Sequence, residues 1–173
     1  MLVAAMNPCK CGYYPDRSRC TCMEPQIRQY LSRISKPLLD RIDICAEAVP
    51  MKYEQEKGRG EGEPSSAIRE RVEAARIIQR QRLKDSGIYF NSAMNGAQIR
   101  AFCSLDQKEQ AFLKRIFEHM GLSARGYGKI LKVARTIADL AGSSEIKKEH
   151  LAEAAGLRGL EEKYWGGSHY DIT

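Results

Sequence analysis

A polar, glycine-rich stretch near residue 60 divides the sequence into two unlike parts. Residues 57–63 read Lys-Gly-Arg-Gly-Glu-Gly-Glu and contain no apolar side chain. Such a stretch cannot contribute to a hydrophobic core, so residues 51–64 are predicted to form a flexible linker or mobile loop. The chain is therefore expected to fold as two parts, residues 1–50 and 65–157, followed by a tail at residues 158–173.

The part before the linker combines strand-like and loop-like segments. Residues 2–6 and 42–49 are short apolar runs typical of buried strands in a parallel sheet. Between them lie a loop rich in Cys, Gly, Pro and Arg at residues 7–25 and a predicted helix at residues 26–34. A strand at residue 2 has no preceding strand to pair with, so the chain is expected to begin inside an α/β domain.

After the linker the sequence has the periodicity of helices. Apolar spacing and capping residues predict helices at about residues 65–84, 97–103, 106–120, 123–141 and 144–155. Asp106, Ser123 and Ser144 are expected to cap the last three of these, and Gly121 and Gly142 are expected to end the helices that Asp106 and Ser123 begin. The predicted fold class is mostly α, with the C-terminal remnant of an α/β core followed by a bundle of four to five helices.

Composition narrows the class of protein. Hydrophobic residues make up 43% of the chain, and no apolar run approaches the roughly 20 residues that span a bilayer. A globular chain in the cytoplasm, with no membrane partner, is expected. The net charge of +6 favours polyanionic partners such as nucleic acids or nucleotide phosphates.

Four of the six cysteines form two close pairs, and thiolates clustered in a loop are the usual ligands of structural zinc. Within each pair the two cysteines are separated by a single residue, a spacing tighter than that of common zinc motifs. A structural Zn²⁺ site and a set of free thiols therefore both remain open. The four residues are Cys9, Cys11, Cys20 and Cys22. Cys45, in a predicted strand, and Cys103, in a predicted helix, are expected in the core.

Asn7 and Arg41 stand where a phosphate group could be contacted. Asn7 ends the predicted strand at residues 2–6, and ligands of open α/β sheets bind outside the carboxyl ends of strands. Arg41 lies between Asp40 and Asp43, which could fix the direction of a guanidinium offered to a phosphoryl group. The simpler interpretations are a turn residue for Asn7 and an exposed ion pair for Arg41.

Arg125 occupies the first turn of the predicted helix 123–141, where the helix dipole disfavours a cation unless an anion is bound nearby. Three further cations, Lys129, Lys132 and Arg135, fall on the same side of the helix. A solvated basic face is the usual explanation of such a stripe. Arg125 is therefore a candidate phosphate ligand only if the stripe is not purely a solvated surface.

Four segments in this order resemble the Mg-chelatase-like AAA+ family, in its ComM/YifB-type, competence-associated branch. They are AAMNPCKCGYY at residues 4–14, LLDRID at 38–43, LSAR at 122–125 and VARTIADLAG at 133–142. The resemblance extends from the first residue to about residue 157, and its specificity comes from the combination of motifs. It implies that residues 1–50 are the C-terminal part of an AAA+ α/β core and residues 65–157 its helical lid.

The resemblance also implies roles for individual residues. Asn7 looks like sensor 1, Arg41 like the arginine finger and Arg125 like the sensor 2 arginine of the lid. The full-length parent is then expected to use ATP and Mg²⁺ and to form a ring hexamer in which the finger reaches a neighbour's ATP site. DNA is the implied partner, in branch migration during natural transformation.

The sequence departs from the family pattern in one respect. It contains no G-x-x-x-x-G-K-[ST] phosphate loop and no acidic Walker B run after a strand. Both are expected upstream of residue 1 in the parent, which is expected to be an ATPase. The chain alone is predicted to be inactive toward ATP.

Two other functions remain open: a non-enzymatic, zinc-containing nucleic-acid-binding module, and an ATPase subunit that drives metal insertion by Mg-chelatase. The predicted helix 65–84 bears on the first. Its apolar stripe of Ile68, Val72, Ala75 and Leu83 is expected to face inward, and it has no aromatic residue on which bases could stack. Its six basic side chains therefore predict a solvated face with ion pairs such as Glu73–Arg76; they are Arg69, Arg71, Arg76, Arg80, Arg82 and Lys84.

Overall fold

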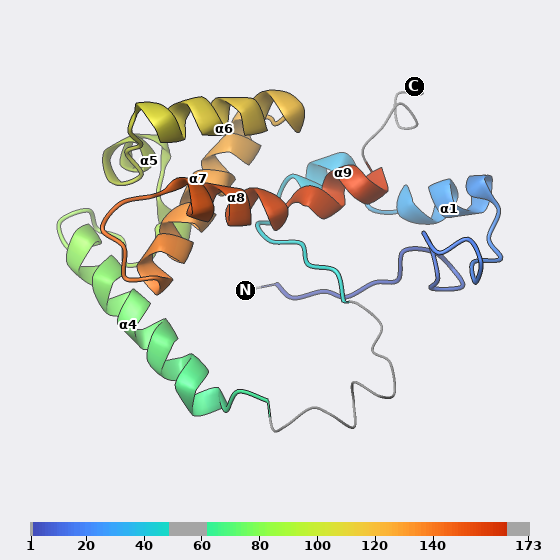
Figure 1. Ribbon diagram of the computed structural model, residues 1–173, viewed down its shortest axis with the longest axis horizontal. Coiled ribbons are helices and arrows are strands. Elements are labelled where there is room, and N and C mark those ends of the chain that lie inside the picture. Colours follow the sequence, from blue (N-terminus) through green and yellow to red (C-terminus); the bar gives the residue numbers. More distant parts are fainter. Residues whose placement is uncertain (1, 49–61, 166–173) are drawn as a thin grey trace. The chain divides into compact units, whose positions relative to one another are not determined.

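The computed structural model describes residues 2–48 and 62–165 (Figure 1). Within those residues the regular elements are α-helices and one short 3-10 helix, and no strand is formed. The mostly α prediction is confirmed. In chain order the elements are α1 (Glu24–Leu31), α2 (Lys36–Leu39), α4 (Ser65–Leu83), η1 (Asn91–Ala93), α5 (Gly96–Phe102), α6 (Gln107–His119), α7 (Ala124–Leu140), α8 (Lys148–Gly156) and α9 (Gly159–Trp165).

The chain divides into two compact units, which are described separately. The cysteine-loop unit comprises residues 1–42 together with 159–173, and the helical unit comprises residues 43–158. The predicted linker at residues 51–64 lies largely outside the described part of the chain, so the predicted domain boundaries stay a prediction.

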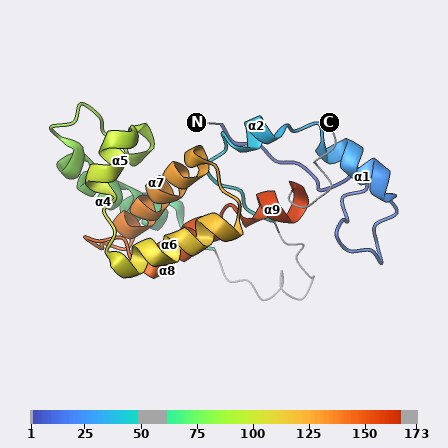
Figure 2. The ribbon, with the colours of Figure 1, turned by 90° about the horizontal axis from the view of Figure 1, so that it is seen from above.

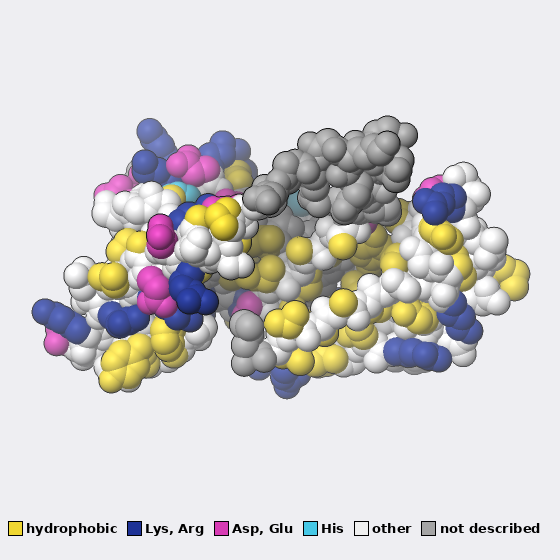
Figure 3. All heavy atoms as spheres, turned by 90° about the horizontal axis from the view of Figure 1, so that it is seen from below, with side chains coloured by type: hydrophobic (Ala, Val, Ile, Leu, Met, Phe, Trp, Pro, Cys, Tyr) yellow, Lys and Arg dark blue, Asp and Glu magenta, His cyan; other side chains and the backbone are white. Residues whose placement is uncertain are grey.

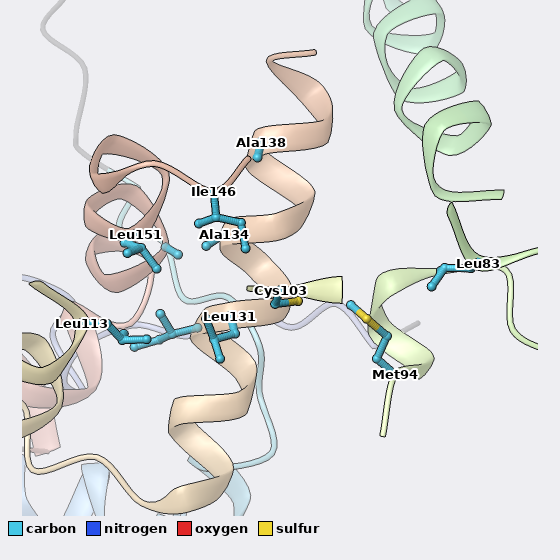
Figure 4. Close-up of a cluster of buried hydrophobic side chains, with 11 residues drawn as sticks. Leu83, Met94, Cys103, Leu113, Leu131, Ala134, Ala138, Ile146 and Leu151 are labelled. Atoms are coloured by element: carbon cyan, nitrogen blue, oxygen red, sulfur yellow. The ribbon is translucent and has the colours of Figure 1, made fainter. Parts of the chain in front are cut away.

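Helix α7 is the centre of the helical unit, since α4, α5, η1 and α8 all contact it (Figures 1 and 2). Figure 4 shows Leu131, Ala134 and Ala138 of α7 facing side chains from the neighbouring elements. Leu113 of α6 and Leu151 of α8 complete the same buried cluster. Apolar burial on this scale stabilises the unit by roughly 1.5–3 kcal/mol per fully buried large side chain.

The predicted caps explain where α6 and α7 begin and end. Asp106 accepts hydrogen bonds from the backbone N–H groups of Lys108 and Glu109, and Ser123 accepts one from Gly126. Gly121 and Gly142 follow α6 and α7 with positive φ angles of 54° and 66°, a conformation that glycine adopts at little cost. The cap predicted at Ser144 is wrong, because α8 begins only at Lys148.

The apolar stripe of α4 is buried over only part of its length. Ala75 and Leu83 are buried, as predicted, whereas Ile68 and Val72 are 43% and 37% exposed. The prediction that all four face inward is therefore wrong for the first two turns. The reason is tertiary: α7 is the helix that contacts α4, and it covers the second half of the stripe but not the first.

Residues 2–6 show why a strand prediction can fail. Leu2 and Val3 are each 80% exposed, and neither 2–6 nor the described part of 42–49 is a strand. A strand satisfies its backbone groups only by pairing with another strand. The described residues offer no such partner, so both segments are extended without being part of a sheet.

The cysteine-loop unit has a small core of its own. Cys9, Ile27 and Leu31 are buried in it, and Tyr164 and Trp165 of α9 pack against them. The indole N–H of Trp165 donates to the carbonyl oxygen of Leu31 at 3.0 Å. The first part of the predicted tail at residues 158–173 forms α9.

Among the described residues, no helix is long and apolar enough to cross a membrane.

Candidate functional site

The four loop cysteines come together in space. Their sulfur atoms all lie within 4.8 Å of one another. The Sγ of Cys9 is 3.3 Å from that of Cys11 and 3.8 Å from that of Cys20, and Cys11 and Cys20 are 3.6 Å apart. Cys22 completes the set.

The loop is shaped so that both pairs can converge. Gly12 follows Cys11 with φ +84°, a conformation open to glycine but costly for most residues, and its N–H donates to the carbonyl of Cys9 at 3.1 Å. This tight turn reverses the chain after the first pair. Asp16 then accepts hydrogen bonds from the N–H and hydroxyl of Ser18, which turns the chain again toward the second pair.

The environment of the four thiols favours negative charge at two of them. At Cys9, burial is outweighed by backbone hydrogen bonds at Tyr14 and Gly12, which lower its pKa. A backbone hydrogen bond at Tyr13 is the largest influence holding the pKa of Cys11 down to about 6, and burial opposes it. Burial raises the pKa of Cys20 to about 11, and the nearby Cys11 charge adds to the increase. Repulsion from the thiolate of Cys11 therefore opposes ionisation of Cys20, a repulsion that a bound cation would remove.

The sulfur positions fit tetrahedral zinc. At a Zn–S distance of about 2.3 Å, tetrahedral geometry separates neighbouring sulfurs by about 3.8 Å. The separations of 3.3–3.8 Å and the overall limit of 4.8 Å bracket this value. The residues present are therefore a suitable ligand set for a structural Zn²⁺ ion.

Asn7 lies beside this loop. Its side-chain amide nitrogen is 3.6 Å from the point where a Cβ on Gly12 would stand, and Asn7 itself is exposed. It follows an extended segment, not the predicted strand. Asn7 is therefore placed next to the first cysteine pair, with its side chain accessible.

Arg41 follows α2 and is exposed. Its guanidinium donates to the carbonyl oxygen of Pro37 at 2.6 Å, which fixes the side chain against the preceding helical turn. Of the two carboxylates expected to bracket it, Asp43 pairs with Lys129 at 2.9 Å instead. The guanidinium is thus directed by a backbone carbonyl more than by the predicted Asp43.

The four cations predicted on one side of α7 have different environments. Lys129 pairs with Asp43, and Lys132 donates to the carbonyl oxygen of Ser92 at 2.9 Å. Arg135 is only 3% exposed. Arg125 is exposed in the first turn, and no carboxylate within the described part of the chain pairs with it. The solvated basic stripe is therefore wrong for Arg135, and Arg125 stands apart from the other three.

A buried charge network accounts for Arg135. Asp139, 2% exposed, accepts two hydrogen bonds from Arg82 at 2.7 and 2.6 Å and one from Arg135 at 3.1 Å. Arg135 also donates to the carbonyl oxygens of Ser143 and Ser144. Sequence reasoning missed this network because a buried arginine has the same helical spacing as a solvated one.

Asn91 extends the network to the loop after α4. It is 1% exposed, and its side chain donates to Asp139 at 2.8 Å and to Thr136 at 3.0 Å. Arg82 donates to its side-chain oxygen at 3.0 Å. The buried network leaves no carboxylate unpaired, and its hydrogen bonds fix the position of Asn91.

The segment immediately after Arg41 is fixed to the helical unit at two points. One is the ion pair of Asp43 with Lys129, whose side chain is only 14% exposed. The other is the backbone N–H of Cys45, which donates to the carbonyl oxygen of Leu157 at 2.7 Å. Cys45 is half-buried in an extended segment and not in the predicted strand, whereas Cys103 is buried in the core as predicted.

Two protein families match the chain in succession. "Magnesium chelatase, subunit ChlI" matches residues 1–56, and "Magnesium chelatase, subunit ChlI C-terminal" matches residues 62–158. The two matches together cover both parts of the chain on either side of the glycine-rich stretch.

Individual relatives agree with the family matches. Competence protein ComM of Haemophilus influenzae is 41% identical over 160 residues, which cover 92% of this chain and 30% of that protein. The Escherichia coli protein YifB is 39% identical over 162 residues, 92% of this chain and 31% of that protein. The Mycobacterium tuberculosis protein Rv2897c is 32% identical over 157 residues, 91% of this chain and 31% of that protein. The chain thus spans about a third of the length of these relatives.

Proposed function

The chain belongs to the magnesium chelatase ChlI family, among proteins of the ComM/YifB type, and from that premise we propose that it supplies the phosphate-sensing residues of an ATP-driven motor that acts on DNA. Such a motor is a Mg-chelatase-like AAA+ protein, for which ATP and Mg²⁺ are the expected cofactors. The proposal assigns sensor 2 to Arg125, the arginine finger to Arg41 and sensor 1 to Asn7.

The observation that carries the proposal is the contrast between Arg125 and the other cations of α7. Lys129, Lys132 and Arg135 each have a partner within the helical unit. Arg125 has none among the described residues and stands at the helix N-terminus, where the dipole disfavours a cation by about 0.3–1 kcal/mol. A phosphate group would be stabilised there by the arginine and by the free N–H groups of the first turn together.

Arg41 has the properties that an arginine finger needs. It is exposed, and its guanidinium is fixed by the carbonyl of Pro37, so it can be offered to a phosphoryl group bound by another subunit. A finger of this kind stabilises transition-state charge and is worth about 10³–10⁵-fold in hydrolysis rate. Subunits of a ring, proposed to be a hexamer, would supply it to one another.

DNA is the proposed substrate of the motor. Support comes from the Haemophilus influenzae relative, which is named as a competence protein, and from the net charge of +6, which favours polyanions. Branch migration of DNA strands during natural transformation is the specific activity that we propose.

A chimera tests the assignment. The aligned segment of Haemophilus influenzae ComM is replaced by this chain, and ATP hydrolysis is measured beside unmodified ComM. Arg41→Ala and Arg125→Ala in the chimera are each expected to lower the rate by at least about tenfold, and Arg115→Ala, an exposed arginine of α6, to leave it unchanged. Equal rates in the chimera and its three variants, or no hydrolysis by ComM itself, would contradict the proposal. The isolated chain is expected to show no turnover.

We also propose that Cys9, Cys11, Cys20 and Cys22 hold a structural zinc ion. The supporting observation is the convergence of the four sulfurs within 4.8 Å at separations that suit Zn²⁺. The ion would tie together the two loop segments that carry the cysteine pairs, which is the usual role of zinc in small units.

Metal analysis of protein purified without chelator tests the zinc site. About one equivalent of zinc is expected, falling in Cys11→Ser and staying unchanged in Cys45→Ser. Less than about a tenth of an equivalent in the unmodified protein would show that the four residues are free thiols.

A further inference from the structure

Three of the four loop cysteines are within reach of solvent. Cys11, Cys20 and Cys22 are half-buried, whereas Cys9 is fully buried. The sulfur atoms of Cys11 and Cys20 lie 3.6 Å apart. A disulfide requires about 2.05 Å between sulfurs, so a movement of about 1.5 Å would bond this accessible pair.

Hydrogen bonds within the loop itself hold these two thiols close. The N–H of Asp16 donates to the carbonyl oxygen of Tyr13 at 2.8 Å, and the N–H of Cys20 donates to the carbonyl oxygen of Asp16 at 2.8 Å. The residues between Cys11 and Cys20 thus form consecutive turns that bring the chain back toward its starting point. Because the fold has already closed the loop, little further chain entropy is lost when the two sulfurs are joined.

The loop is open to small molecules from the solvent. Lys10, Arg17 and Arg19, which stand between the cysteines in the sequence, are all exposed. Figure 3 shows Lys and Arg side chains beside hydrophobic ones at the surface of the cysteine-loop unit, which lies at the right as in Figure 1. Reactive cysteines are found in such partly exposed, electropositive surroundings, whereas buried structural cysteines are inert.

We propose that the cysteine loop is a thiol–disulfide switch, in which a hydroperoxide joins Cys11 to Cys20 and the zinc ion is released. The inference rests on the proposed zinc site and adds a means of regulating it. The disulfide removes two of the four ligands, and Cys9 with Cys22 cannot complete the four-coordinate shell of a structural zinc ion. Metal binding and the disulfide are therefore alternative states of the same residues.

The reaction balances with a hydroperoxide as the added oxidant. With hydrogen peroxide, the thiolate of Cys11 attacks the O–O bond, which leaves a sulfenic acid on Cys11 and releases hydroxide. The thiolate of Cys20 then attacks the sulfur of that sulfenic acid, so that the S–S bond forms, the S–O bond breaks and a second hydroxide leaves. Each hydroxide takes a proton from the solvent. In sum, two thiolates lose two electrons, and one peroxide is reduced to two water molecules.

Hydrogen peroxide treatment of the full chain, purified without chelator and freed of reductant, tests the inference. Free thiols are counted, and released zinc is followed with a colorimetric chelator. Two of the six thiols are expected to be lost, with release of about one equivalent of zinc, and dithiothreitol is expected to restore both thiols. Cys45→Ser, outside the cluster, is the matched control and is expected to show the same zinc release and the same loss of two thiols.

Tryptic peptides identify the two partners. Cleavage after lysine and arginine leaves Cys9 in residues 1–10, Cys11 in residues 11–17, and both Cys20 and Cys22 in residues 20–28. Mass spectrometry is expected to find a disulfide between peptides 11–17 and 20–28. That bridge is expected to remain in Cys22→Ser and to disappear in Cys20→Ser.

The outcomes separate this inference from the zinc site on which it rests. Zinc retained under peroxide, with all six thiols intact, would overturn the switch and leave the zinc site standing. A bridge between peptides 1–10 and 11–17, a bridge that persists in Cys20→Ser, or thiol loss that dithiothreitol does not reverse would also overturn it. Protein that contains no zinc before treatment would contradict the zinc site instead. In that case the expected peptide bridge would still support the disulfide between Cys11 and Cys20, and its absence would overturn it.

Discussion

Asp139 is the residue on which the buried charges of the helical unit converge. Two guanidinium groups, those of Arg82 and Arg135, donate to one carboxylate that is 2% exposed. Burial lowers the pKa of Arg135, and the charge of Asp139 opposes the change. Both arginines remain charged, and the carboxylate is the group that makes their burial tolerable.

Asp139→Asn keeps the shape of the side chain but removes its charge. The variant is expected to lose about 3–5 kcal/mol of unfolding free energy, because the buried Arg135 and the partly buried Arg82 lose their counter-ion. Glu73→Gln is the matched control, since Glu73 also pairs with two arginines, Arg76 and Arg80, but at the surface. Its expected cost is below about 1 kcal/mol. Urea unfolding of both variants measures the difference; equal costs would show that the network contributes no more than surface pairs do.

The sequence predicts single residues well where the determinant is local. The caps at Asp106 and Ser123 and the ends at Gly121 and Gly142 depend on residues within one helical turn, and they are confirmed. Whether a cation on α7 is solvated depends on residues far along the chain, such as Arg82, 57 residues from Asp139. Arg125 and Arg135 therefore have the same pattern in the sequence and different environments in the structure.

At the scale of elements, α7 organises the helical unit because its apolar side chains contact four neighbouring elements. Its length, 17 residues from Ala124 to Leu140, is close to that predicted. The wide apolar arc of α7 makes this outcome predictable, because a helix that is apolar over much of its circumference has to be surrounded.

Substitutions along α7 test its central position. Ile130 is fully buried and Leu140 is 47% exposed, so the two give a matched pair within one helix. Ile130→Ala is expected to cost about 2–5 kcal/mol of unfolding free energy, because it leaves a cavity. Leu140→Ala is expected to stay within about 0.5 kcal/mol of the unmodified protein. Guanidinium unfolding checks both, and similar midpoints would argue against α7 as the core helix.

The cap of α6 gives a smaller and more local prediction. Asp106 accepts from the N–H groups of Lys108 and Glu109 at 2.8 and 3.0 Å. Asp106→Ala is expected to cost about 1 kcal/mol, because both donors lose their acceptor near the helix N-terminus. Lys108→Ala, two residues later and exposed, serves as the control and is expected to be near neutral. Thermal unfolding followed by circular dichroism distinguishes the two.

Two kinds of element were not predictable from the sequence. The segments at 2–6 and 42–49 have strand composition, but a strand exists only with a partner, and the described residues supply none. α9 is the opposite case: its local sequence pattern is weak, yet it forms a helix. It is held by contacts with residues more than 130 positions earlier, such as that of Trp165 with Leu31. The periodicity of apolar residues reveals neither that a pairing strand is missing nor that a helix packs on residues far along the chain.

At the scale of the whole molecule, the cysteine-loop unit depends on both ends of the described chain. The rings of Tyr14 and Tyr164 meet edge to face, with centroids 6.0 Å apart, and Trp165 packs on the same core. The predicted site residues are divided in the same way: Asn7, Arg41 and the four cysteines belong to this unit, and Arg125 to the helical unit. The cysteines are brought together as the paired spacing suggested, whereas the roles of Asn7, Arg41 and Arg125 stay predictions.

Chelation of the proposed zinc is expected to affect the two units differently. Trp165 is the one tryptophan of the chain, so its fluorescence reports on the cysteine-loop unit alone. Excess chelator is expected to shift its emission to longer wavelength, because the loop core opens to water. Far-UV circular dichroism is expected to keep most of its helical signal, since α4 to α8 have a separate core. Unchanged Trp165 emission from protein shown to have lost its zinc would separate the metal from the stability of this unit.

Two residues that follow Arg41 closely in the sequence are held within the helical unit. Asp43 is held by Lys129, and Cys45 by the carbonyl of Leu157. Two residues of fully extended chain reach only about 7 Å, so the tether between Arg41 and its first anchor has almost no slack. Lys129 is one helical turn from Arg125. Under the proposed function, the chain segment that carries Arg41 is therefore linked, within two residues, to the helix that carries Arg125.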